Sequence, residues 1–268
     1  MMKTAVTLCR VTEAATGPFV FHDKLPLGFA KAVQHGFTAV ELFLPDADAV
    51  SIDEIKQLQA QHSLEIAAIG TGAGMVKHGL SLTDADPAAR KKALDFILAL
   101  VDFGAEFSAP AILGSMQGKY GGLVGKEQAL TYLAESLRII GCHAKARGVT
   151  FLYEPLNRYE TNLLNTIGDA AAFIQSRQLD NIKILADLFH MNIEEKSLEL
   201  AIADNIEAIG HIHFADSNRR AIGFGHTDRI PLLLLLHQLQ YQGYLSAEIL
   251  PLPSAEEAAA QFILSTQL

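Results

Sequence analysis

The chain lacks the features of several large classes of protein. Its 268 residues include only two cysteines, Cys9 and Cys142, too few for a disulfide framework, and we expect core thiols in a reducing, cytoplasmic setting. It has no run of lysine and arginine longer than three residues and a formal net charge of −9, so we expect no nucleic-acid partner. The longest aliphatic run, residues 232–236, is far too short to cross a bilayer, and MMKTAVTLCR at the start lacks the apolar stretch of a secretory signal. We therefore expect no membrane contact.

The composition favours one large folded unit. Half of the residues are hydrophobic, which is enough to bury a sizeable core, and about 250 residues is the usual size of a (β/α)8 barrel. No linker or low-complexity segment divides the sequence. We predict a single α/β domain, a (β/α)8 TIM barrel over residues 1–268.

Short apolar runs alternate with helical patterns along the chain, which is typical of parallel strand–helix units. Runs such as IKILAD, with few polar residues, suit strands that are covered on both faces. The predicted strands are residues 3–9, 38–43, 64–69, 109–113, 149–154, 182–187, 209–213 and 245–249. The predicted helices are residues 26–35, 51–62, 87–103, 126–147, 166–178, 194–204, 230–241 and 254–265. Eight strands are the number that closes such a barrel.

Five successive leucines, residues 232–236, lie on the helix before the last strand. Five leucines in a row point in all directions around a helix, so something other than the chain's own barrel must cover part of it. We expect a subunit interface, and hence a homo-oligomer, a dimer or a tetramer. The alternative is cover by the C-terminal segment.

Four side chains that can bind a metal ion stand at the ends of predicted strands: Glu154, Asp187, His213 and Glu248. The gaps between them, 33, 26 and 35 residues, match the length of a strand–helix unit. In a closed parallel barrel the C-terminal ends of the strands meet at one rim, so these side chains can gather around a single ion. Three carboxylates and one imidazole favour a hard divalent metal.

Four motifs in order carry a family resemblance: YEPLNRYETNLLNT, ADLFHMNIEE, GHIHFADSNRR and YLSAEILP. Together they resemble the D-tagatose 3-epimerase and D-psicose 3-epimerase group, part of the xylose isomerase-like TIM barrel superfamily of sugar isomerases and epimerases. The resemblance is strong over roughly residues 149–250 and mainly architectural before them. It implies an isomerase that acts on a small-molecule sugar.

The resemblance also assigns residues. It gives the role of metal ligand to the same four strand-end side chains, and it implies Mn(II), with Mg(II) or Co(II) as alternatives; the ligand types alone also admit Zn(II). It implies that Glu160, His190 and Arg219 bind the substrate, holding the oxygens at the carbonyl end of an open-chain ketose.

Chemistry explains why such a reaction needs these residue types. The hydrogen beside a ketone is weakly acidic, and a bound cation can stabilise the enediolate that forms when it is removed. Inversion at C3 then needs a base on one face of the carbon and an acid on the other. The resemblance gives these roles to Glu154 and Glu248. We predict a metal-dependent epimerase acting at C3 of a ketose or a keto-sugar acid by proton abstraction through an enediolate.

Several further residues have a functional and a structural interpretation. A glycine-rich loop brings Gln117 and Lys119 near the predicted rim, where the lysine either meets a carboxylate or phosphate of the substrate or is simply solvated. His211 either orients a ligand or is a satisfied core histidine. Asp216 is expected to cap a helix or a loop, and His226 either touches the substrate or, as we favour, lies in an ordinary glycine turn. The chain has no tryptophan, which related sugar pockets commonly use as an apolar wall.

Other functions remain open at this point. An aldose–ketose isomerase of the hydroxypyruvate isomerase kind would use similar chemistry, and a polyol dehydratase would use the same metal with a leaving hydroxyl. A DNA-repair endonuclease would need more metal-binding histidines and a basic face. A sugar-binding protein without activity would not need two facing glutamates.

Overall fold

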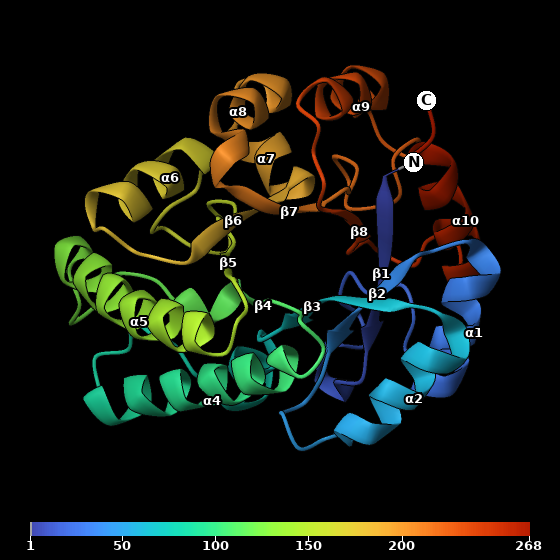
Figure 1. Ribbon diagram of the computed structural model, residues 1–268. Helices are drawn as coiled ribbons and strands as arrows, with labels where there is room; N and C mark the ends of the chain where they lie inside the picture. The colour runs from blue at the N-terminus through green and yellow to red at the C-terminus, as the bar shows by residue number, and fades with distance from the viewer. Residues whose placement is uncertain (1) are drawn as a thin grey trace.

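The computed structural model describes residues 2–268, which form a closed barrel of parallel strands inside a ring of helices (Figure 1). The strands follow one another around the barrel in sequence order, and β1 closes it by pairing with β8. The strands are β1 Lys3–Cys9, β2 Ala39–Phe43, β3 Glu65–Gly70, β4 Ala111–Leu113, β5 Phe151–Tyr153, β6 Ile182–Asp187, β7 Ile209–His213 and β8 Tyr244–Ala247. The predicted (β/α)8 barrel is confirmed.

Helices connect the strands and cover the outside of the barrel (Figure 1). The α-helices are α1 Leu25–His35, α2 Ile52–His62, α3 Ala73–His78, α4 Pro87–Ala105, α5 Lys126–Ala146, α6 Ile167–Ser176, α7 Leu188–Glu194, α8 Leu198–Asn205, α9 Arg229–Gln238 and α10 Ala255–Ser265. Three short 3₁₀ helices are η1 Thr12–Ala14, η2 Ser115–Gln117 and η3 Ile206–Ala208. Side-chain caps fix several starts, as where the carboxylate of Asp86 accepts the backbone N–H of Ala88 at 2.9 Å.

The main difference from the predicted elements lies after β6. One helix was expected over residues 194–204, but the chain forms α7 directly after the strand and then α8. The side chain of Asp187 starts α7 by accepting the backbone N–H of Phe189 at 2.7 Å, and that of Ser197 starts α8. Because α8 contacts α6 and α9, it takes the place in the outer ring, and α7 is an extra element at the rim (Figure 1).

The barrel interior is divided into an apolar and a polar side. Strand register places Glu41 beside Ala68 and Leu185 beside His211, so these four side chains share the inner face. Ala68, Leu185 and two neighbours form an apolar cluster, whereas Glu41 and His211 are buried polar groups. One side of the barrel interior beneath the rim therefore contains buried ionisable side chains.

Three expectations concern the surface. Within residues 2–268, none of the helices is both long enough and apolar enough to span a membrane. On α9, Leu232, Leu233 and Leu236 are buried against the barrel, whereas the side chain of Leu234 is 47% exposed. Cys142 is exposed on α5, so the expectation of a core thiol is wrong for it; it holds for Cys9, which is buried.

Candidate metal centre

The structure brings the four strand-end side chains together at the rim. Asp187 and His213 are the last residues of β6 and β7, and Glu154 and Glu248 follow β5 and β8 directly. One ligand atom from each lies within 4.8 Å of those of the other three. From His213 Nδ1 the distances are 3.7 Å to Glu154 Oε1, 3.6 Å to Asp187 Oδ2 and 3.5 Å to Glu248 Oε2.

Three of the four facing atoms of this cluster have no hydrogen-bond partner. Glu154 Oε1, Asp187 Oδ2 and His213 Nδ1 are all buried without one, and an unsatisfied buried polar group is costly. A divalent ion binds oxygen and nitrogen at about 2.0–2.2 Å, which sets neighbouring ligands about 3.0–3.6 Å apart. The observed spacing is close to that range, and the oxygen and imidazole donors suit such an ion. The cluster therefore fits a divalent metal.

The electrostatics of the cluster also favour a cation. Burial, and then the charge of Glu248, raise the pKa of Glu154 well above its ordinary value. Burial lowers the pKa of His213, but the charges of Glu41 and Glu248 outweigh it, so that this pKa lies well above its ordinary value. Without a cation the cluster therefore retains protons, which a divalent ion would displace.

Neighbouring groups hold two of these carboxylates in place. Asp187 uses Oδ1 to cap α7, which leaves Oδ2 directed into the cluster. A Cβ atom on Gly114 would lie 2.5 Å from Glu154 Oε2, so a larger residue here would displace the carboxylate from this position. Gln117 donates from its side-chain amide to the carbonyl oxygens of Gly114 and Glu154, at 2.9 and 3.0 Å. Gln117 is thus a buried support for the site.

The three residues predicted to bind substrate surround the same cluster. His190, buried on α7, has an unpartnered Nε2 at 3.8 Å from Glu154 Oε1, and Asn157 contacts its Nδ1 at 2.7 Å. The guanidinium of Arg219 donates to Glu248 Oε2 at 3.1 Å and to Glu160 Oε1 at 3.4 Å. These contacts link the substrate residues to the proposed ligands.

Arg219 has a strained backbone and a fixed side chain. Its φ angle is 62°, the left-handed region that non-glycine residues rarely adopt. Its guanidinium carbon lies 4.7 Å from the centre of the Phe189 ring, a cation–π contact. Asp216, whose backbone oxygen accepts the N–H of Arg219 at 2.8 Å, holds the surrounding loop with its carboxylate, so its expected role as a loop cap is confirmed.

A cavity of about 300 Å³ opens onto the cluster. Its lining includes the polar side chains of Glu154, Glu160, His190, His213, Arg219 and Glu248. Its lining also includes the rings of Phe19 and Phe43, whose centroids lie 4.5 Å apart. These phenylalanines form an apolar wall of the cavity, the role for which related sugar pockets commonly use a tryptophan. Lys119 and His226 are not among the lining residues, and the amine of Lys119 instead approaches the backbone oxygen of Tyr159 at 3.4 Å.

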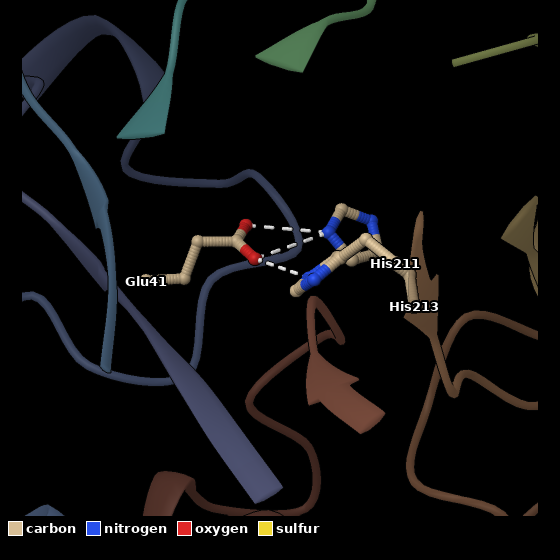
Figure 2. A group of neighbouring side chains, drawn as sticks. All are labelled: Glu41, His211 and His213. Atoms are coloured by element: carbon tan, nitrogen blue, oxygen red, sulfur yellow. Dashed lines mark hydrogen bonds and ion pairs between the residues drawn. The ribbon is translucent and has the colours of Figure 1, made fainter. Parts of the chain in front are cut away.

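Glu41 is the residue that the sequence interpretation missed. It lies on β2, is only 4% exposed, and contacts the imidazoles of both His211 and His213 (Figure 2). His211 is thus a satisfied core histidine that also belongs to the surroundings of the cluster. A signal was available, since a glutamate in the otherwise apolar run AVELF is unusual for a strand buried on both faces.

A parallel barrel with carboxylates and a histidine at the C-terminal ends of its strands is typical of metal-dependent enzymes that act on small molecules. Residues 29–266 match the family model described as xylose isomerase-like TIM barrel, and the chain belongs to this family. A ketose 3-epimerase from Arthrobacter globiformis is 30% identical over 228 residues, which cover 80% of this chain and 73% of that protein.

A 3-dehydro-D-guloside 4-epimerase from Escherichia coli (strain K12) is 39% identical over 116 residues, which span 44% of that protein's length and 43% of this chain. The solved apo structure of a 3-keto-D-glucoside 4-epimerase from E. coli has a TM-score of 0.81 and 24% identity, with 99% of both chains covered. Other relatives are named D-psicose 3-epimerases, so the predicted resemblance to that group is confirmed, and with it the isomerase class.

Proposed function

We propose that the protein is a metal-dependent sugar epimerase that inverts the carbon next to a ketone, in the first place C3 of a ketose. The observation that carries the proposal is the set of unpartnered buried atoms from Glu154, Asp187 and His213, of which Glu154 and His213 line the cavity. We assign the four metal ligands to Glu154, Asp187, His213 and Glu248. When bound, the metal would stabilise the negative charge that develops on the substrate's oxygens.

The proton transfers fall to the two glutamates that follow β5 and β8. Three steps around the barrel separate these strands, so Glu154 and Glu248 approach the cavity from different sides. One removes the proton beside the ketone and the other returns one to the opposite face, in the order that the handedness of the substrate sets. Arg219 stabilises the charge of Glu248 through their contact of 3.1 Å. We propose that Glu160, His190 and Arg219 bind the oxygens at the carbonyl end.

The cavity bears on the choice between a neutral ketose and a keto-sugar acid. Among the described residues that line it, Arg219 is the one permanent cation, and Glu160 and Glu248 already pair with it. Lys119, which the sequence suggested as a partner for a carboxylate, lies elsewhere. A substrate carboxylate would thus meet no unpaired positive side chain, and we favour a neutral sugar.

A second candidate is epimerisation at C4 of a 3-keto-glycoside. The similarity to the 3-dehydro-D-guloside 4-epimerase supports it. The chemistry is the same, because C4 of a 3-keto sugar and C3 of a 2-ketose both lie beside the carbonyl carbon. The two candidates differ only in where the remainder of the sugar lies in the cavity.

Proton NMR in D2O separates these reactions. Magnesium-loaded protein is incubated with ketopentoses, ketohexoses, keto-sugar acids and a 3-keto-glycoside. Deuterium at C3 of a ketose together with its epimer supports the first proposal, and deuterium at C4 of the glycoside supports the second. Formation of an aldose would instead indicate an isomerase, and loss of water a dehydratase. Absence of exchange in every sugar would refute epimerisation.

Variants test the two-base scheme. Replacing Glu154 or Glu248 by glutamine removes one proton-transfer group, and we expect turnover to fall by at least about 10²–10⁴-fold. Glu135→Gln on the exposed face of α5 is the matched control and should leave turnover unchanged. Near-normal turnover in either active-site variant would contradict the scheme.

We further propose Mn(II) as the metal, with Mg(II) or Co(II) as alternatives, because mixed carboxylate and imidazole ligands are compatible with all three. Exposed apolar side chains on α9, Ile230 at 40% and Leu234 at 47%, support a homo-oligomer, a dimer or a tetramer. Two unpaired cysteines support a cytoplasmic location. Metal analysis of protein purified without added ions, light scattering and cell fractionation test these three points.

A further inference from the structure

Glu41 joins strands that are not neighbours in the barrel. Its carboxylate, on β2, lies 3.0 Å from Nε2 of His211 and 3.2 Å from Nε2 of His213, both on β7 (Figure 2). The hydroxyl of Ser246, on β8, donates to the same carboxylate at 3.0 Å. Strands β1 and β8 separate β2 from β7, so Glu41 reaches across the interior of the barrel.

A buried carboxylate is costly unless hydrogen bonds compensate it, and Glu41 has three contacts of that kind. The buried side-chain atoms without a partner include Glu154 Oε1, Asp187 Oδ2 and His213 Nδ1, but no atom of Glu41. Glu41, His211 and His213 lie close enough together to suggest a second metal site. Because the atoms between them are already paired, hydrogen bonding accounts for this group without a second ion.

The two nitrogens of His213 therefore face different partners. Nε2 faces the carboxylate of Glu41, an acceptor, and so carries a proton. Nδ1 faces the oxygens of Glu154, Asp187 and Glu248 and has no hydrogen-bond partner. An imidazole that donates through one nitrogen keeps a lone pair on the other, which is the form that binds a metal.

We propose that Glu41 is a positioning residue that holds His213 as the Nε2–H tautomer and directs its Nδ1 lone pair at the metal. The proposal rests on the proposed function, because it assumes that His213 is a ligand. The His211 ring, which lies at 83° to that of His213 with centroids 5.4 Å apart, limits rotation of the ligand ring. Glu41, which also lines the cavity, would thus act on the metal through its contact with His213.

The first test needs no variant. Long-range ¹H–¹⁵N correlation NMR of the magnesium-loaded wild type reports which ring nitrogen of His213 carries the proton. We expect Nε2–H with Nδ1 bound. An Nδ1–H tautomer would overturn the proposal. Calorimetry of the same protein with Mn(II) gives the reference dissociation constant, and absence of any binding would overturn the metal assignment of the proposed function as well.

The second test is Glu41→Gln, which keeps the shape of the side chain but replaces one acceptor oxygen with an amide donor. Loss of such an outer contact typically weakens metal binding by about 10–100-fold. Ser246→Ala is the matched control, because it removes one bond to Glu41 but leaves both histidine contacts, and we expect a much smaller loss.

Unchanged Mn(II) affinity in a folded Glu41→Gln variant, with His213 still in the Nε2–H form, would overturn the proposal. Weaker binding in both variants to the same extent would also overturn it, since that result indicates a general loss of packing. Weaker binding in Glu41→Gln alone, with a mixture of His213 tautomers, supports it.

Discussion

Replacing Asp216 by asparagine is expected to open the loop that carries Arg219. The carboxylate of Asp216 accepts four backbone N–H groups. Oδ1 accepts those of Ser217 and Thr227 at 2.7 and 2.9 Å. Oδ2 accepts those of Gly223 and Gly225 at 2.9 and 2.7 Å. Each carboxylate oxygen therefore accepts two backbone hydrogen bonds, and these bonds hold residues 216–227 in a closed loop.

The magnitude follows from this geometry. Asparagine retains one acceptor oxygen and puts an amide donor where the other oxygen was, so two N–H groups lose their acceptor. Hydrogen bonds to a charged group contribute about 1.5–3 kcal/mol each, so we expect a loss of about 3 kcal/mol or more. The strained φ of Arg219, 62°, then loses the loop that maintains it, and the KM for the sugar should rise.

Urea unfolding and substrate kinetics measure the two effects. The matched control is Asp86→Asn at the start of α4, where the side chain accepts a single N–H and asparagine is an equally good cap. We expect little change in stability or KM there. A difference below about 0.5 kcal/mol between Asp216→Asn and wild type, with the KM unchanged, would refute the reasoning.

Asp216→Asn should also change how the free energy of unfolding depends on pH in acid. Burial raises the pKa of Asp216, but the N–H donors, Thr227 first, outweigh it and the pKa is lowered in the folded protein. A lowered folded-state pKa stabilises above the unfolded pKa of about 3.9, and that contribution disappears as the pH falls through the folded-state value. The gap in stability between wild type and variant should therefore narrow in acid.

Three further outcomes are expected. Chelation of the metal should abolish turnover reversibly and lower the melting temperature. An ion at 100 times its dissociation constant adds about 2.7 kcal/mol to the free energy of unfolding. Turnover in rigorously metal-free protein would contradict the metal assignment. Metal binding should release protons, because the pKa values of Glu154 and His213 are raised when no metal is bound. The affinity for the metal should therefore fall as the pH falls. Calorimetry in several buffers counts the protons released. Iodoacetamide should modify exposed Cys142 in the native protein and Cys9, whose pKa burial raises, only after unfolding, as mass spectrometry would show.

The sequence predicted the barrel well because each strand is a short apolar run between helical patterns. The regular spacing of the strands also predicted that Glu154, Asp187, His213 and Glu248 lie close together, since parallel strands all end at one rim. Extra turns at the rim were harder to predict. Asp187 both ends β6 and caps α7, and a strand-end residue that starts a helix at once leaves no loop in the sequence to mark the boundary.

Contacts across the barrel could not be predicted in this way. Glu41 and His213 are far apart in the sequence, and their pairing depends on which strands face each other through the interior. The apolar wall of Phe19 and Phe43 likewise joins a loop to a strand end. Periodicity reports which residues are buried but gives no partner for them, so only the folded structure shows these pairs.

The close approach of Gly114 to Glu154 has a consequence for how such a protein can evolve. Because a Cβ atom at position 114 would lie 2.5 Å from the glutamate's oxygen, any substitution there displaces the carboxylate. The two positions are therefore epistatic: a larger residue at 114 becomes acceptable only in a background where Glu154 has changed or moved. Libraries designed to broaden the range of sugars should keep this glycine invariant and diversify the Phe19 and Phe43 wall of the cavity.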